Sequence, residues 1–399
     1  MNFLRAAVIL LMCVISARAE WRPDYSLRGY VRETPIYWKP PPYLSDTGER
    51  RFDNILHARL NGRLYPASRL RIGAELKTRI FTGESAQEMR QQADISSHLQ
   101  PYFRLSRTFS ESDHAIWTGS VDRLWLQWEP GPLTFTAGRQ RVAWGTNWVW
   151  NPTDVFNPSS PFDFDNEEKP GADAVRAEWY LGPNSVLDAA FAPQEKADSS
   201  VAAARLKVNR WEYDWIVLAG RRGPTTVAGF AWAGHIRGGG FRGEILYTML
   251  RAGSGWRFMF PPFFSFIEEH KDNLTAAISG DYTFPSSLYL HGEVLYNEHG
   301  TTDKAGGVRQ VFAFLKGDLT PARLSLFGEV AQDLSPLVRA SVAGILNPYD
   351  LSWYAGPTVS WSVITNLDVV GAGLIFGGDE YTEFGDAGEM LMARIKWSF

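Results

Sequence analysis

The sequence contains very little cysteine: Cys13 is the only one in 399 residues, and it lies in an apolar run near the amino terminus. Residues 1–19 combine an early arginine, that apolar run and the small residues Ala17 and Ala19, which predicts a secretory signal that is removed on export. Residues 20–399 then form a single domain without cysteine. Such an exported chain must be held together by a large core or by a closed hydrogen-bonded sheet.

Long apolar runs and strong net charge are also absent. No stretch after residue 19 reaches the roughly 18 consecutive apolar residues of a membrane helix, which excludes a helical membrane protein. The formal net charge of -4 and the absence of a basic stripe argue against a nucleic-acid partner. No C-x-x-C-H motif, metal-ligand spacing or nucleophile pattern is present, so we expect neither a cofactor, nor a bound metal, nor an enzyme.

Aromatic residues are abundant instead. They make up 14% of the chain, with 16 tryptophans, although the mean hydropathy of -0.22 is slightly hydrophilic. This combination is typical of a wall that meets lipid on one side and water on the other.

The carboxyl-terminal segment EMLMARIKWSF alternates with a period of two. Leu391, Ile395 and Trp397 are apolar, and Arg394 and Lys396 are the polar residues between them. A final amphipathic strand that stops on an aromatic residue, here Phe399, resembles the signal recognised by the barrel-assembly machinery of Gram-negative outer membranes. The alternative is an ordinary edge strand, although a soluble protein usually covers so apolar an edge.

Residues 68–81, SRLRIGAELKTRIF, show the same alternation. In a barrel the apolar face meets lipid, and the charged face lines the lumen. That charged face consists of Arg69, Arg71, Glu75, Lys77 and Arg79. Related L-x-[LI]-x-[GA]-E patterns place Glu293 and Glu329 on the inward face, a shorter echo at 241–247 does so for Glu244, and Arg59 is expected there too.

These patterns predict an all-β fold, a transmembrane antiparallel β-barrel of roughly 16 to 18 strands in the outer membrane. Assigning alternate up and down strands leads to a conflict at 84–115 and 333–366, so the strand number stays open. Longer connections are expected mostly outside the cell. They are 39–50, 84–97, 143–170, 252–272, 299–307 and 377–388.

The stretch GRQRVAWGTNWVWNPTDVFNPSSPFDF, residues 138–164, fits neither a helix period nor strand alternation. Residues 143–170 are too aromatic for a solvated loop and too rich in proline to extend a sheet. We expect residues 143–170 to fold into the lumen as a constriction, which Arg139 and Arg141 organise by holding loop carbonyls and carboxylates. Trp144, Trp148, Trp150 and Phe156 are expected to wedge this loop against the wall, and Asp154, Asp163 and Asp165 to present acids to the channel. Alternatively, the loop only caps the barrel, and the lumen charges pair with one another.

The same stretch carries a motif, G-R-Q-x-x-x-W-G followed by N-P-x-D-x-x-N-P. It consists of Gly138, Arg139, Gln140, Trp144, Gly145, Asn151, Pro152, Asp154, Asn157 and Pro158. It resembles a motif of outer-membrane barrels of proteobacteria, some related in style to alginate-export porins. The resemblance implies a porin without implying a substrate. The matching region lacks the continuous basic run of alginate exporters.

Two functions are compatible with these features. The first is a porin that passes small polar or charged solutes through a charged lumen narrowed by the aromatic loop. The second is the barrel sleeve of a porin–cytochrome conduit for extracellular electron transfer, with multihaem cytochromes as partners. An inward loop leaves no room for a cytochrome, whereas an outward loop does.

A second aromatic stretch, SGWRFMFPPFFSFIEEH (254–270), is expected in a long connection. So apolar a surface usually marks a contact with a ligand or partner. It suits an entrance for hydrophobic solutes, a contact with outer-membrane lipid and lipopolysaccharide, or a docking site, unless it folds back over its neighbours.

Overall fold

The computed structural model describes most of the chain. The described residues are 24–39, 49–86, 102–157, 168–169, 171–250, 256–260, 264–268, 272–307, 309–310, 313 and 317–399, with only the backbone described at 256–260 and 264–268. The signal expected at 1–19 lies outside them. So do Asp163 and Asp165 and the side chains of the aromatic stretch 254–270.

Eighteen strands form a closed antiparallel barrel, because each pairs with the next along the chain and the last pairs with the first. They are β1 (Asp24–Lys39), β2 (Arg51–Ala67), β3 (Leu70–Gly83), β5 (Ala115–Trp128), β6 (Leu133–Gln140), β7 (Ala172–Gly182), β8 (Ser185–Ala192), β9 (Val201–Arg210), β10 (Tyr213–Arg222), β11 (Thr225–Ile236), β12 (Gly239–Leu250), β15 (Asn273–Thr283), β16 (Leu288–Asn297), β17 (Leu324–Ser335), β18 (Val338–Leu346), β19 (Trp353–Ile364), β20 (Leu367–Gly377) and β21 (Glu389–Ser398). The predicted fold class is confirmed, at the upper end of the expected strand number.

The remaining elements are short and lie outside this cycle. Strand β4 (Ser106–Glu111) pairs with β5, and β13 (Trp256–Phe260) with β14 (Phe264–Glu268) forms a separate hairpin. A 3₁₀ turn, η1 (Ala197–Ser199), lies between β8 and β9. Among the described residues, no helix has the length and hydrophobicity needed to cross a bilayer.

Strand β4 explains part of the difficulty in counting strands. The residues of β5 nearest the β3–β5 connection pair with β4, and those after Arg123 pair with β6. Thus β4 continues the position of β6 beside β5 and is not a separate crossing. In the second region, β17, β18 and β19 are three ordinary crossings joined by the connections 336–337 and 347–352, and register shifts at Asp333/Ser335 and Ser362/Ile364 interrupt the inward and outward alternation at their ends.

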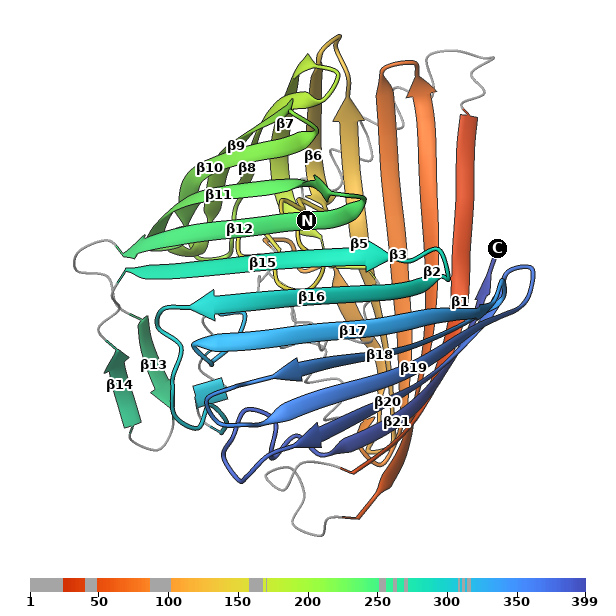
Figure 1. Ribbon diagram of the computed structural model, residues 1–399. Coiled ribbons are helices and arrows are strands. Elements are labelled where there is room, and N and C mark those ends of the chain that lie inside the picture. Colours follow the sequence, from red (N-terminus) through yellow and green to blue (C-terminus); the bar gives the residue numbers. More distant parts are fainter. Residues whose placement is uncertain are drawn as a thin grey trace.

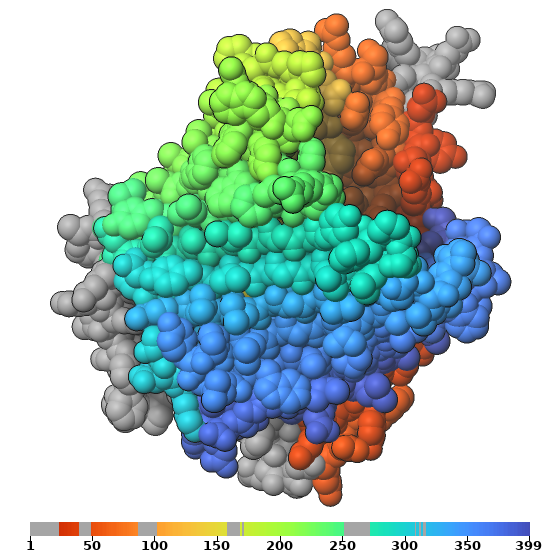
Figure 2. All heavy atoms as spheres, in the orientation of Figure 1, coloured from red at the N-terminus to blue at the C-terminus, as the bar shows by residue number. Residues whose placement is uncertain are grey.

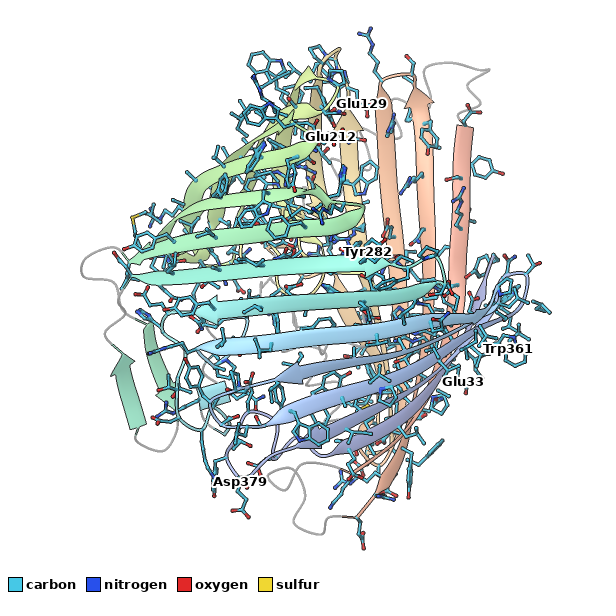
Figure 3. The ribbon with its side chains drawn as sticks, in the orientation of Figure 1. Glu33, Glu129, Glu212, Tyr282, Trp361 and Asp379 are labelled. Atoms are coloured by element: carbon cyan, nitrogen blue, oxygen red, sulfur yellow. The ribbon has the colours of Figure 1, made fainter. Side chains whose placement is uncertain are left out.

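The two ends of the barrel differ in their connections. One end, here called the turn end, carries tight turns such as those after β2, β5 and β9, and the other, the loop end, carries the long connections. Most turns lie toward the upper right of Figure 1. Figure 3 marks the turn end with Glu129 and Glu212, and the loop end with Asp379.

Alternation along the strands separates the two faces as expected. On β21, Leu391, Ile395 and Trp397 are exposed on the outer face. Figure 2 shows the part of this outer face that lies over β12 to β19. On β3, Leu76 is half exposed outside, whereas Lys77 lies on the inner face within reach of Asp122 of β5. Arg69 differs from expectation: it is exposed in the β2–β3 turn, because the pairing of these strands ends at Ala67 and Leu70 and β3 begins only after Arg69.

Aromatic side chains gather on the outer face at two levels. The turn-end level includes Trp128, Trp179, Tyr282, Trp361, Trp397 and Phe399, and the loop-end level includes Tyr37, Phe52, Trp117, Phe191, Tyr247, Tyr296 and Trp353. Aliphatic residues such as Val330 and Val342, each more than half exposed, lie between the two levels. An apolar band between aromatic girdles is the outer surface of a membrane-spanning barrel.

Candidate functional site: the loop inside the barrel

Strand β6 ends early because the chain turns into the barrel after Gln140. Gly138 has φ +114°, a conformation that L side chains rarely adopt, and a Cβ there would lie 2.2 Å from the carbonyl oxygen of Leu124. We call residues 141–157, which follow this kink, the inner loop. Its backbone and side chains contact inward-facing residues of β8, β12 and β16.

Glu244 of β12 is the main anchor of the inner loop. Its carboxylate is fully buried and accepts from the hydroxyl of Thr146 (3.0 Å) and the backbone N–H of Asn147 (2.9 Å). It also accepts from the N–H (2.8 Å) and hydroxyl (2.7 Å) of Thr153, and from the N–H of Thr146. These donors replace the water that a buried carboxylate loses.

Glu293 of β16 is a second anchor on the neighbouring part of the wall. It is 2% exposed and accepts from the backbone N–H groups of Val149 (3.2 Å) and Trp150 (2.7 Å). Asn147 adds a further contact, since its side-chain oxygen accepts from the hydroxyl of Ser279 on β15 at 3.0 Å. The tip of the loop is therefore fixed to three adjacent strands.

Three of the four predicted loop aromatics are buried anchors. Trp144 is fully buried, donates to Asp188 of β8 at 2.8 Å and packs edge-on against Phe156 at 4.9 Å between ring centroids. Both join a core with small and aliphatic residues of β7 to β12. Trp150, 2% exposed, packs with Ala277, Leu295 and other residues of a second core.

Trp148 behaves differently, because 64% of its surface is exposed. One face of its ring lies against Arg242 of β12, whose guanidinium carbon is 5.0 Å from the ring centroid. Arg242 in turn pairs with Asp281 of β15. Trp148 is thus the loop aromatic that meets solvent.

Asp154 is not presented to the channel as expected, since it is only 2% exposed within the loop. Burial raises the pKa of this carboxyl to about 6, and the Lys169 ammonium, 3.7 Å away, acts in the opposite direction. The proline- and tryptophan-rich turns around it pack so tightly on the wall that its side chain is enclosed.

Arg139 organises a different segment from the one predicted. It is buried and makes two hydrogen bonds to Asp173 of β7, at 2.8 and 2.9 Å. It also donates to the carbonyl oxygens of Val121 (3.0 Å) and Phe103. It therefore joins β5, β7 and the chain leading to β4, at the point where β6 leaves the wall, whereas Arg141 is exposed.

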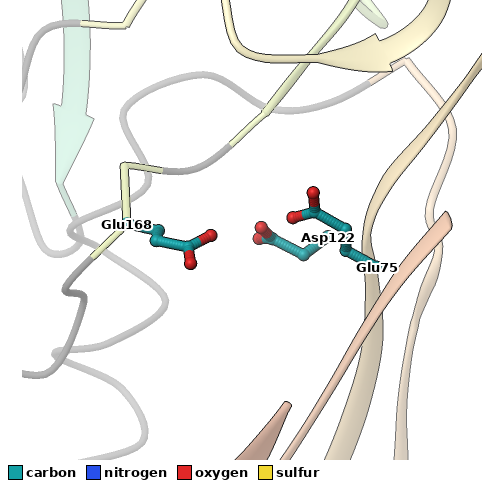
Figure 4. A group of neighbouring side chains, drawn as sticks. All are labelled: Glu75, Asp122 and Glu168. Carbon is teal, nitrogen blue, oxygen red and sulfur yellow. The ribbon is translucent and has the colours of Figure 1, made fainter. Parts of the chain in front are cut away.

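A cluster of six charged side chains lies on the opposite wall. Arg59 of β2 pairs with Glu75 of β3, with Asp122 of β5 at 2.6 Å and with Glu168 at 2.8 Å, while Lys77 and Arg123 lie within 3.8 Å of these acids. A bulge in β5 leaves both Asp122 and Arg123 buried. Figure 4 shows the three carboxylates converging.

This cluster is also a candidate for a metal site, because one oxygen of each carboxylate lies within 4.8 Å of the others. The arrangement of charges favours ion pairing instead, since three basic side chains already match Glu75, Asp122 and Glu168. Arg123 additionally donates to the carbonyl oxygen of Lys169, so the cluster ties the return of the inner loop to the wall.

The other predicted lumen residues are spread along the barrel. Arg71 pairs with Glu129 at the turn end (3.2 Å), and Arg79 lies over the ring of Phe81. Glu329 lies 4.0 Å from a ring nitrogen of His291. Arg394 and Lys396 line a hollow of about 430 Å³ together with Asp333, Arg339 and Asp368.

The sequence did not mark Asp188, Asp122 or Arg123 as site residues. Asp188 is fully buried and accepts from Arg176, Arg205 and Trp144. The residues of its strand, β8, alternate regularly between buried and exposed positions. A single acid among the inward positions of this strand could therefore have marked Asp188 in the sequence. Glu244 was expected to face inward, but not to hold the loop.

Comparisons with known proteins give the fold. No family model and no curated protein matches the chain. Among solved structures, OccAB2 of Acinetobacter baumannii is 8% identical, covering 94% of this chain and 98% of its own, with a TM-score of 0.59. OccAB4 of the same organism is 7% identical over 96% and 100%, with a TM-score of 0.59. The outer-membrane protein OprD of Pseudomonas aeruginosa is 9% identical over 96% and 95%, with a TM-score of 0.58.

At 7 to 9% identity these likenesses show the fold alone, a closed β-barrel shared with an outer-membrane protein of known structure. The comparisons do not confirm the motif-based likeness to alginate exporters. The closed barrel, its apolar outer band and these likenesses together identify the chain's fold as a multi-pass β-barrel of the outer membrane.

Proposed function

We propose that the protein is an outer-membrane channel that passes small polar or charged solutes, with the inner loop narrowing its lumen. The observation that carries this proposal is the attachment of the loop to the inner wall by two buried carboxylates, Glu244 and Glu293. A loop held by ordered hydrogen bonds across adjacent strands is a fixed constriction, because releasing it would leave those carboxylates unpaired.

The charges of the lumen support selection by polarity. Arg71, Arg394 and Lys396 lie on the inner face, and the hollow at the turn end contains both signs of charge. Charged walls of low dielectric constant focus the field on a narrow water path. Pairing within the Arg59 cluster reduces the part of this field that comes from β2, β3 and β5.

Orientation follows from the usual asymmetry of such barrels. Their short turns face the periplasm and their long connections face outside. On that basis the inner loop descends from the external end, and solutes meet it before the hollow lined by Arg394 and Lys396.

The cytochrome sleeve is the weaker alternative. A sleeve needs an open lumen, and the inner loop extends from β6 to residues of β12, β15 and β16. The position of this loop therefore favours a solute channel over an electron conduit.

Reconstitution of the mature protein in planar bilayers tests the proposal. We expect discrete ion-conducting steps from haem-free protein, and larger steps when residues 145–156 are replaced by a short Gly-Ser linker. A correctly folded barrel that conducts no ions in either form, or that co-purifies with haem, would contradict a solute channel.

A further inference from the structure

Trp148 is held rigidly although it is exposed. The N–H of Asn147 on one side donates to Glu244, and that of Val149 on the other side donates to Glu293. Both carboxylates are buried in the wall. The exposure of the ring is therefore a property of the ordered loop and does not reflect a loose segment.

An exposed indole in this setting calls for an explanation. Burying a large aromatic side chain stabilises a fold, and Trp144 and Trp150 on the same loop are buried in this way. The chain instead fixes the residues on both sides of Trp148 and leaves its ring in contact with water. Such a ring is available to stack on a passing solute.

The surroundings of the ring define the face that it offers. Arg242 covers one side of the indole at 5.0 Å and is itself fixed by Asp281. Arg242 lies two residues nearer the turn end than Glu244 on the same inward face of β12, so the ring lies on the turn-end side of the loop. The cation attracts π density toward the covered face, which makes the free face a poor site for a second cation and a suitable one for a neutral ring.

We propose that Trp148 is a solute-contact platform that recognises neutral solutes with a flat, apolar ring face, whether aromatic or pyranose. The proposal rests on the channel function above and adds a substrate class to it. A ring passing the constriction stacks on the free face of Trp148, whereas an acyclic solute of similar size makes no equivalent contact.

Solute-induced blocking of single channels tests this platform. The probes are nicotinamide with butyramide as its acyclic partner, and glucose with sorbitol as its acyclic partner. In the wild-type channel we expect longer blocking events for the ring compound of at least one pair. Trp148→Ala should shorten them about fivefold, equivalent to about 1 kcal/mol, and Trp148→Phe should retain most of the effect.

Trp179→Ala is the matched control, since it removes a half-exposed indole from the outer face. It should leave the ring preference unchanged. The aromatic and sugar pairs distinguish the two kinds of ring. The platform is disproved if ring and acyclic solutes block an ion-conducting wild-type channel for equal times. It is also disproved if Trp148→Ala shortens the blocking events of ring and acyclic solutes alike. A wild-type protein that does not conduct overturns the channel itself, so the two failures are distinguishable.

Discussion

Two parts of the inner wall carry buried acids, but they satisfy them in different ways. On β2, β3 and β5, Glu75 and Asp122 pair with Arg59, Lys77 and Arg123. On β12 and β16, Glu244 and Glu293 face backbone and hydroxyl donors of the inner loop. In the first region the acids pair with basic side chains of the same wall. In the second region the acids accept hydrogen bonds from the inner loop and so hold that loop on the wall.

The comparison is informative because Glu75 and Glu293 come from nearly the same local pattern, a glycine or alanine followed by glutamate on an amphipathic strand. Their strands present both side chains to the lumen. What differs is the neighbour: an arginine on the adjacent strand in one case, and the amides of an inserted loop in the other. The role of an inward acid thus depends on what faces it.

Removing Glu244 should have the largest effect. Glu244→Ala leaves the buried donors of Thr146, Asn147 and Thr153 without an acceptor, which costs on the order of 5 kcal/mol of loop attachment. We expect the loop to detach and single-channel conductance to rise severalfold. Glu329→Gln is the control, since this residue shares the pattern and has no hydrogen bond to the described part of the loop. Equal conductance of the two variants would show that Glu244 is no anchor.

Breaking the charge cluster should instead affect the wall. Arg59→Met leaves Glu75, Asp122 and Glu168 with less compensating charge and should lower barrel stability by about 3 kcal/mol. Urea unfolding followed by the heat-dependent gel shift of folded barrels measures this. The three carboxylates should then bind Ca²⁺, so that calcium restores stability in the variant and not in the wild type. If the variant unfolds like the wild type, the cluster contributes nothing.

Asp154 makes the loop side sensitive to pH. Its pKa is raised from 3.8 to about 6. The contribution of this carboxyl to the stability of the packed loop is therefore fully present below about pH 4 and is lost as the pH rises through about 6. Asp154→Asn should stabilise loop packing by about 3 kcal/mol at pH 7.5 and have little effect at pH 4.

Conductance recorded from pH 4 to pH 8 checks this. Burial also raises the pKa of Glu383, in the connection after β20, to about 7, so some pH dependence should persist in the variant. The informative quantity is the part of the pH dependence of the conductance that Asp154→Asn removes. If the two pH profiles are identical, Asp154 does not influence the loop.

The smallest expected effect concerns the link between loop and wall at Trp144. Trp144→Phe keeps most of the apolar packing but removes the hydrogen bond to Asp188. We expect loop attachment to weaken by about 1 kcal/mol, visible as faster hydrogen exchange of loop amides with little change in conductance. Loss of the folded barrel in this variant would show that Trp144 stabilises the barrel wall itself and does not act through loop attachment.

Several expectations followed directly from residue patterns. The period of two at 68–81 and 389–399 identified which side chains face lipid, because successive residues of a strand point to opposite faces. Prolines and tryptophans in 143–170 predicted a segment that neither extends the sheet nor stays in solvent, and the described residues 143–157 pack inside the barrel. The strand number was not available, because β4 is a strand that does not cross the barrel wall and because bulges blur the ends of neighbouring strands.

The contacts of individual side chains were harder to predict from the sequence. Arg139 holds Asp173 and Phe103, which are distant in the sequence, and Asp154 is enclosed where exposure was expected. Arg69 lies in the turn just before the first residue of β3.

The sequence alone determined that the chain forms a barrel, which faces of its strands meet lipid, and that one central segment is exceptional, because these properties depend on local periodicity and composition. Only the tertiary structure decided which acids are paired within the wall, which ones hold the loop, and which tryptophan is left facing water. Those outcomes depend on closing the barrel, which brings residues more than a hundred positions apart into hydrogen-bonding distance, as with Trp150 and Glu293.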